Sequence, residues 1–255
     1  MRGFRSGLRL QLSFFRNVPD TLIPLLTGPL FTLVFSMVLR HGGRADLSAY
    51  AVIAPFYMSL WWFAVFTGGF VIQTERWEGT IEYLVAAPVG FASVVVGRIA
   101  TMMFAGAVAF AEVWFFGRYV LGVDVTIHHP YVFAASLVLT LFAMTTTALF
   151  MANLFVLSRT AVTFSNSASY PVYVLGGILV PVALLPGWLR PVSDIVFMSW
   201  SARLLRGSLG AGPISGAAFD LGMLALLAVA ALALGAVFMS RILNSVRRTG
   251  ELALR

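Results

Sequence analysis

Long apolar runs recur along the whole chain and constrain its fold more than any other feature. Six of them are long enough to cross a hydrocarbon core about 30 Å thick as helices of about 20 residues. We expect these six spans at residues 21–39, 50–72, 93–120, 131–157, 161–182 and 217–239. Backbone polar groups in lipid must be satisfied within the chain, and the alternating pattern of barrel strands is absent. The sequence therefore predicts an all-α integral membrane protein with six transmembrane helices.

The distribution of arginine predicts the orientation of these spans. Six spans place both termini on one side of the membrane, and eleven of the 17 arginines lie on that side against six on the other. Positively charged loops are retained in the cytoplasm, so we expect both termini to be cytoplasmic. Residues 74–88 are then cytoplasmic, and residues 183–207 are external.

The residue types that the chain lacks exclude several functions. A nucleotide-binding P-loop needs a lysine on the phosphates, and the chain has no lysine, so we do not expect it to hydrolyse ATP or to be an enzyme by itself. It has no cysteine, and the adjacent His128 and His129 cannot share one helical face, so no metal site is expected. The basic and aromatic pattern of nucleic-acid binding is also missing. We expect no cofactor on this chain and no nucleic-acid partner.

The residues before the first span predict an amphipathic helix. Wound as a helix, this stretch gathers its arginines within an arc of about 60°, beside an arc of apolar side chains. The arginines are Arg2, Arg5, Arg9 and Arg16. We expect residues 1–20 to lie on the cytoplasmic leaflet and to face lipid phosphates or a partner protein; an unstructured, positively charged anchor is the alternative. A transmembrane domain at 21–240 and a basic cytoplasmic tail at 241–255 complete the predicted organisation.

A compact acidic segment, TERWEGTIEYLVAAPVG, separates the second and third predicted spans. Wound as a helix, it places three carboxylates within about 60° and three apolar side chains in another arc. These are Glu75, Glu78 and Glu82 on the acidic side and Trp77, Ile81 and Leu84 on the apolar side. An acidic stripe opposes the negative cytoplasmic leaflet, which favours a basic protein surface as its partner; a solvated loop helix is the alternative. We predict a helix at 74–88, ended by Pro88.

The stretch at 183–207 lies between the fifth and sixth predicted spans and is too polar to cross the membrane. It is amphipathic and is interrupted by Pro186 and Pro191. Short external re-entrant helices fit this pattern.

These two segments resemble those of a known family. ERWEGTIEYLVAAPVG resembles the coupling region of type-2 ATP-binding-cassette permeases, which carry Glu-Arg, Gly-Thr, Glu and Leu, and a small residue before Pro. GGILVPVALLPGWLRPVSDIVFMSWSARLLRG resembles the external pattern of the same family, with Leu-Pro-x-Trp, a second Pro and a terminal Leu-Arg. The resemblance covers essentially the whole chain. It departs at Phe197 and Met198, where the family often has Asn-Pro, and no role is transferred to those two positions.

The resemblance implies partners and site residues. Such a permease pairs with a second permease, a copy of itself or a similar paralogue, and docks on two ATPase subunits that bind ATP and Mg on separate chains. The implied ATPase-coupling residues are Glu75, Arg76, Trp77, Glu78, Gly79, Thr80, Ile81, Glu82, Leu84 and Pro88. The implied external gate consists of Pro181, Pro186, Trp188 and Pro191.

The implied function is export across a bacterial cytoplasmic membrane by alternating access, driven by the partner ATPases. An amphiphilic small molecule, a drug, antibiotic or lipid, is the expected substrate, and a polysaccharide is the less favoured one.

Polar residues within the predicted spans are candidates for a substrate pathway. They are Glu112, Thr146, Asn153, Asn166 and Ser169. An ionisable residue inside a span is a functional candidate by default, so Glu112 supports the alternative of a stand-alone secondary transporter or channel, unless it pairs with a nearby arginine. Hydroxyl and amide side chains in spans also join helices to one another. A membrane enzyme acting on lipid has no catalytic constellation here.

Overall fold

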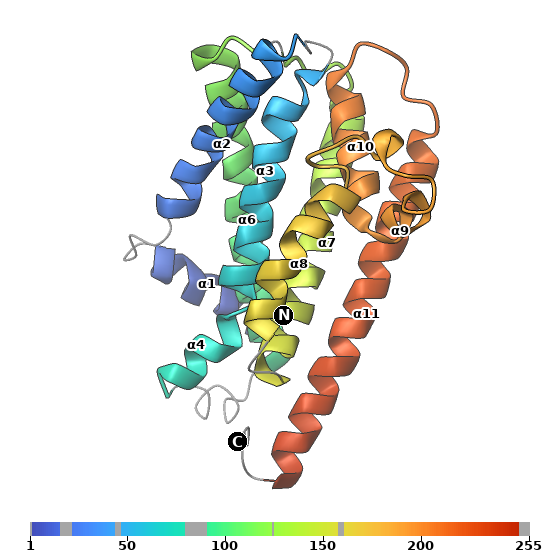
Figure 1. Ribbon diagram of the computed structural model, residues 1–255. Helices are drawn as coiled ribbons and strands as arrows, with labels where there is room; N and C mark the ends of the chain where they lie inside the picture. The colour runs from blue at the N-terminus through green and yellow to red at the C-terminus, as the bar shows by residue number, and fades with distance from the viewer. Residues whose placement is uncertain are drawn as a thin grey trace.

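The computed structural model describes residues 2–15, 22–43, 47–79, 91–123, 125–157 and 161–249, and every regular element in these ranges is helical (Figure 1). The elements in chain order are α1 (Arg2–Phe15), α2 (Leu22–His41), α3 (Tyr50–Trp62), η3 (Phe63–Gly68), α4 (Val71–Trp77), α6 (Phe91–Phe115), η4 (Phe116–Val120), α7 (Pro130–Leu157), α8 (Ala161–Leu175), η5 (Val182–Leu184), α9 (Arg190–Ile195), α10 (Phe197–Leu209) and α11 (Ala217–Thr249). The prediction of a helical protein is confirmed.

Four helical segments of the described chain are long and apolar enough to cross a membrane. They are Tyr50–Glu75, Phe91–Val120, Pro130–Phe155 and Ala217–Arg241, and they match the second, third, fourth and sixth predicted spans. The apolar part of α2, Leu26–His41, is shorter. The structure therefore supports a multi-pass membrane protein, and the count of six spans stays a prediction.

Two predicted boundaries differ from the observed ones. The fifth predicted span, 161–182, corresponds to α8, which ends at Leu175 because Gly177 adopts a left-handed φ of 65° and turns the chain. The predicted tail from residue 241 begins inside α11, which continues to Thr249. No glycine or proline interrupts the chain between Arg241 and Thr249, so nothing local ends the helix there.

The second predicted span is a compound element. The α-helix α3 passes into the π-helical turn η3 and then, after Gly69, into the short helix α4, which turns away from the axis of α3 (Figure 1). A side chain at Gly69 would place its Cβ 2.2 Å from the Val65 carbonyl oxygen, so only glycine fits this bend. The bend points α4 toward the end of the bundle opposite to α10 (Figure 1). We call these two ends the α4 end and the α10 end.

The helix α3 forms the centre of the bundle, and α11 forms its edge. α3 packs against α2, α6 and α10, and its side chains Ile53, Phe56, Tyr57 and Leu60 are fully buried. α11 packs along α7 but leaves many apolar side chains exposed, including Leu226. Such a surface is stable only in an apolar solvent or against another protein, which agrees with a lipid-facing helix.

The stretch at 183–207 forms η5, α9 and most of α10, as short helices rather than one span. α10 lies within the bundle, against α7 and α11, and buries Met198, Trp200, Leu204 and Leu205. Pro191 lies in the first turn of α9, where proline is tolerated, so it helps to begin a helix rather than end one. Their re-entrant role stays a prediction.

Candidate functional site

The helix α1 crosses α6 in direct backbone contact. A Cβ atom at Gly7 would lie 2.2 Å from the Val94 carbonyl oxygen, and one at Gly97 would lie 2.4 Å from the Phe4 carbonyl oxygen. Both positions therefore require glycine, one on each helix. The predicted helix before the first span is present, and the face with Gly7 packs on protein.

One buried arginine joins α1, α4 and α6. Arg98, on α6, is only 3% exposed. It forms an ion pair with Glu75 of α4 and donates a hydrogen bond from its Nε to Gln11 Oε1 of α1 at 3.1 Å. Removing one member of such a buried pair leaves an uncompensated charge and typically costs about 3–5 kcal/mol. We call Gln11, Glu75 and Arg98, with the crossing at Gly7 and Gly97, the α1–α4–α6 junction.

This junction corrects the prediction of one exposed acidic stripe. Glu75 is 5% exposed and faces Arg98, whereas Glu78 is exposed to solvent. The two carboxylates differ in burial because the buried cation that α6 supplies, Arg98, faces only Glu75. Glu75 therefore holds helices of this chain together, and its role in ATPase coupling stays a prediction.

The predicted helix at 74–88 also differs at its start. The helix α4 begins at Val71 and ends at Trp77, and the chain turns at Gly79, whose φ is 68°. Trp77 is 69% exposed, and its ring lies 5.9 Å from that of Phe70. Five predicted coupling residues lie outside the described residues, as does the side chain of Arg76. The five are Thr80, Ile81, Glu82, Leu84 and Pro88.

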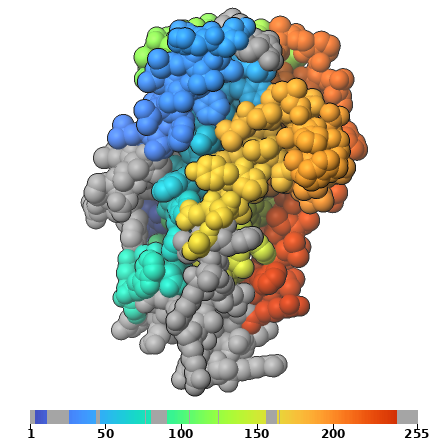
Figure 2. All heavy atoms as spheres, viewed as in Figure 1, coloured from blue at the N-terminus to red at the C-terminus, as the bar shows by residue number. Residues whose placement is uncertain are grey.

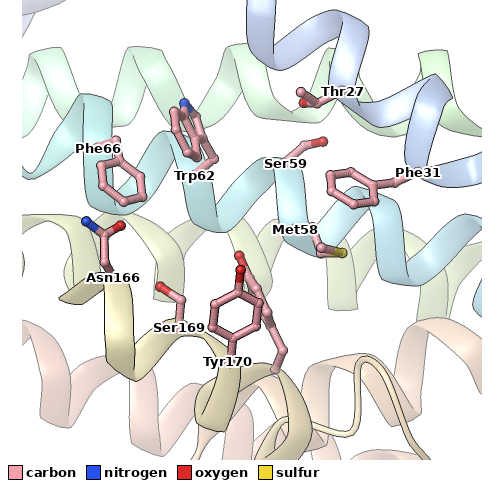
Figure 3. Close-up of a pocket in the computed structure, with 10 residues that line it drawn as sticks. Thr27, Phe31, Met58, Ser59, Trp62, Phe66, Asn166, Ser169 and Tyr170 are labelled. Carbon is pink, nitrogen blue, oxygen red and sulfur yellow. The ribbon is translucent and has the colours of Figure 1, made fainter. Parts of the chain in front are cut away.

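A pocket of about 440 Å³ opens between α2, α3 with η3, and α8. Figure 2 shows part of α3 and η3 between α2 and α8 on this face. The aromatic rings of Phe31, Trp62, Phe66 and Tyr170 line the pocket, and none of its lining residues is charged (Figure 3).

Ser59 and Asn166 are polar residues of the pocket lining. Ser59 Oγ is buried and has no hydrogen-bond partner among the described residues, and the Asn166 side chain is exposed at the pocket wall (Figure 3). Ser169 Oγ is already used, because it accepts a bond from Trp61 Nε1 at 2.9 Å and donates to the Ser165 carbonyl at 2.7 Å. An unpaired buried hydroxyl costs about 1–3 kcal/mol, and a ligand acceptor or donor would recover part of that cost.

The predicted pathway residues do not come together in one place. Asn166 and Ser169 line the pocket. Thr146 bonds to the Ala143 carbonyl within α7, and Asn153 Nδ2 donates to the Gly235 carbonyl of α11 at 3.1 Å. Asn153 thus joins α7 to α11, as the alternative interpretation expects, whereas Thr146 bonds only within its own helix.

Glu112 lies on α6 outside the residues that line the pocket. Its side chain is partly buried, and its Oε2 atom is buried with no hydrogen-bond partner in the described part of the chain. No ion pair with a nearby arginine is seen there either. Glu112 therefore stays a candidate without an assigned partner.

The predicted external gate residues lie on the surface of the α10 end. Pro186, Trp188 and Pro191 are exposed, and Pro181 is partly buried beside η5. None of them lines the pocket, and their role in a gate stays a prediction.

The sequence analysis missed several residues that the structure places at these sites. Arg98 lies inside the predicted third span, and an ionisable residue there was a signal that could have singled it out. Ser59, Trp62 and Tyr170 carry no comparable signal, because serine and aromatic residues are common in spans.

Comparison with known families identifies a match over most of the chain. The family model described as ABC-2 type transporter matches residues 7–209, from Gly7 at the crossing of α1 and α6 to the last residue of α10. The comparison with curated proteins found no match.

Proposed function

The chain belongs to the ABC-2 type transporter family, and from this premise we propose that it is the permease subunit of an ATP-driven exporter. The observation that carries the proposal is the family match over residues 7–209. The chain supplies the membrane domain, and ATP and Mg bind to two ATPase subunits on separate chains. Both termini face the cytoplasm of a bacterial cell.

The α1–α4–α6 junction supports a role in coupling. The residues that follow α4 form the predicted docking segment. Arg98 of α6 pairs with Glu75 of α4 and also bonds to Gln11 of α1, so it joins all three helices. A displacement of the docking segment therefore moves three elements together instead of bending one of them. Exposed Trp77 and Glu78 extend beyond the junction, where an aromatic anchor and a charge suit protein docking.

The pocket supports export of an amphiphilic small molecule. Its volume of about 440 Å³ lies within the range of about 300–1,000 Å³ for small-molecule sites. Uncharged aromatic walls with a few polar groups fit a drug, an antibiotic or a lipid better than a polysaccharide, whose many hydroxyls need polar partners.

The exposed face of α8 supports a second permease subunit. Thr163, Asn166, Ser167 and Tyr170 are exposed on this helix. Polar side chains in spanning helices face protein or water far more often than lipid. A second copy or a similar paralogue facing α8 would enclose the pocket in a shared pathway.

Purification tests the proposal directly. The tagged chain is purified from its native membrane in mild detergent, with mass spectrometry and an ATPase assay on the eluate. We expect an ATPase subunit to co-purify with the wild type and to be lost with Trp77→Ala combined with Glu78→Arg. Trp188→Ala is the matched control, because it removes an equally exposed tryptophan at the α10 end.

A second candidate function rests on Glu112, whose Oε2 atom is buried without a partner in the described structure. A stand-alone transporter could use this carboxyl to carry a proton or a cation. Purified chain that transports in liposomes without any ATPase, and loses transport with Glu112→Gln, would favour this candidate and contradict the exporter.

A further inference from the structure

One arginine bridges three elements at the α10 end. Arg206, on α10, donates a hydrogen bond from Nη1 to the Gly177 carbonyl oxygen at 2.9 Å. Its guanidinium carbon lies 4.3 Å from the ring centre of Tyr50. Gly177 belongs to the turn after α8, and Tyr50 is the first residue of α3. A single side chain thus holds the end of α8 close to α3 and α10.

The partners of Arg206 are neutral. The ion pairs recorded in the described ranges are those of Arg98 with Glu75 and of Arg203 with Asp220, and Arg206 takes part in neither. A carbonyl oxygen and an aromatic face hold a cation less strongly than a buried carboxylate does. The contact with Gly177 is therefore one that can be broken and remade.

One side of this bridge is firmly attached to the bundle. Ser201, also on α10, hydrogen-bonds to Tyr57 of α3 and to Thr140 of α7, and all three hydroxyls are buried. Breaking these bonds would leave several buried hydroxyl groups unpaired at once. We therefore take α3, α7 and α10 as the fixed side.

The other side has the features of a moving element. α8 forms one wall of the pocket with Asn166, Ser169 and Tyr170. The bond from Trp61 to Ser169 attaches the middle of α8 to α3, so the part expected to move is its α10 end, beyond this bond. It ends at a turn in which Gly177 has a φ of 65°, a backbone conformation that few other residues allow.

We propose that Arg206 is a positioning residue that latches the α10 end of α8, and that its bond to the Gly177 carbonyl breaks when the pocket opens toward this end. In the latched state, which the structure shows, the α10 end of α8 is held close to α3 and α10. In the released state Arg206 remains over Tyr50 while α8 moves with its glycine turn. The inference rests on the proposed transport function and adds the residue that controls one opening of the pocket.

Thiol labelling tests the latch, because the chain has no cysteine. Ser59→Cys places one thiol at the pocket wall, where Ser59 is 2% exposed. The probe is a membrane-impermeant maleimide added to intact cells, and the rate of labelling is measured. Adding Arg206→Met should raise the rate about tenfold, as expected for losing a hydrogen bond from a charged group.

Matched variants separate the latch from a general loosening. Arg203→Met removes the neighbouring arginine, which faces Trp200 and Asp220 instead, and it should leave the rate unchanged. Arg206→Lys keeps the charge and a donor but loses the planar stacking on Tyr50, so an intermediate rate is expected. If Arg206→Met does not fold, Arg206→Lys alone decides. Wild-type rates in the folded Arg206 variants, or an equal rise with Arg203→Met, would overturn the proposal.

A control thiol keeps this test independent of the proposed function. Trp188→Cys lies exposed at the α10 end and should be labelled in intact cells. If it is not labelled, the proposed orientation is wrong, and the same rates are then measured in inside-out vesicles. The labelling requires neither ATP nor an ATPase partner. The proposal of an ATP-driven exporter can therefore be contradicted while the Arg206 latch is confirmed, and the latch can be contradicted while the exporter is confirmed.

Discussion

The two ends of the bundle hold an arginine in different ways. At the α4 end, Arg98 is buried and pairs with the carboxylate of Glu75. At the α10 end, Arg206 is partly buried and is held by the Gly177 carbonyl and the Tyr50 ring. Breaking a buried ion pair costs about 3–5 kcal/mol, whereas a hydrogen bond to a charged group contributes about 1.5–3 kcal/mol. By these values the contacts of Arg98 are the stronger ones, which agrees with the proposal that α8 separates at the α10 end while the α4 end moves as one body.

The largest expected effect breaks the α4 end. Arg98→Met leaves Glu75 buried without its cation, and we expect a loss of about 3–5 kcal/mol in stability. The measurement is the thermal unfolding midpoint of the purified chain in detergent. Adding Glu75→Gln removes the orphaned charge and should restore most of the midpoint. A double variant as unstable as Arg98→Met would contradict the ion pair as the organising contact.

A smaller effect is expected at the helix crossing. Gly97→Ala places a methyl group 2.4 Å from the Phe4 carbonyl oxygen, which forces α1 away from α6 and costs about 1–3 kcal/mol. Gly222→Ala on α11 is the matched control, because a Cβ there meets open space. We expect Gly97→Ala to lower the unfolding midpoint and to uncouple ATP hydrolysis from transport in the purified complex. Equal unfolding midpoints and equal coupling in the two variants would show that the packing of α1 on α6 does not contribute to the junction.

The α10 end should tolerate a change better. Arg206→Met loses one hydrogen bond from a charged group and one ring contact, so we expect a loss of about 2–4 kcal/mol, below that of Arg98→Met. The same unfolding measurement compares the two variants side by side. A loss for Arg206→Met as large as that for Arg98→Met would erase the difference between the two ends.

The smallest effect on stability is expected in the pocket. Ser59→Ala removes a buried hydroxyl that has no partner in the described structure, so stability should stay within about 1 kcal/mol of the wild type or rise. Transport should show a raised KM for a substrate that bonds to this hydroxyl, with kcat nearly unchanged. Thr146→Ala is the control, because its hydroxyl bonds within α7. A raised KM for both variants would place the substrate elsewhere.

Local properties of the sequence were enough to predict the helical class, four of the spans and the family. The predicted span at 93–120 corresponds to α6 with η4, Phe91–Val120, and the one at 131–157 to α7. Hydropathy belongs to each run of residues by itself, and an apolar run of this length has few other stable forms in lipid. The two motifs are also local, and their resemblance indicated the family that the match over residues 7–209 confirms.

The partners of the polar residues were decided by tertiary structure. Spacing placed Glu75 and Glu78 on one arc of a helix, but only the packing of α6 on α4 buried the first against Arg98 and left the second exposed. Gln11 meets Arg98 across 87 residues of sequence, and Asn153 meets Gly235 across 82. Helical periodicity fixes the order of side chains around one helix. Which neighbouring helix faces each side chain depends on how the helices pack, and that choice separates a docking surface from an internal ion pair.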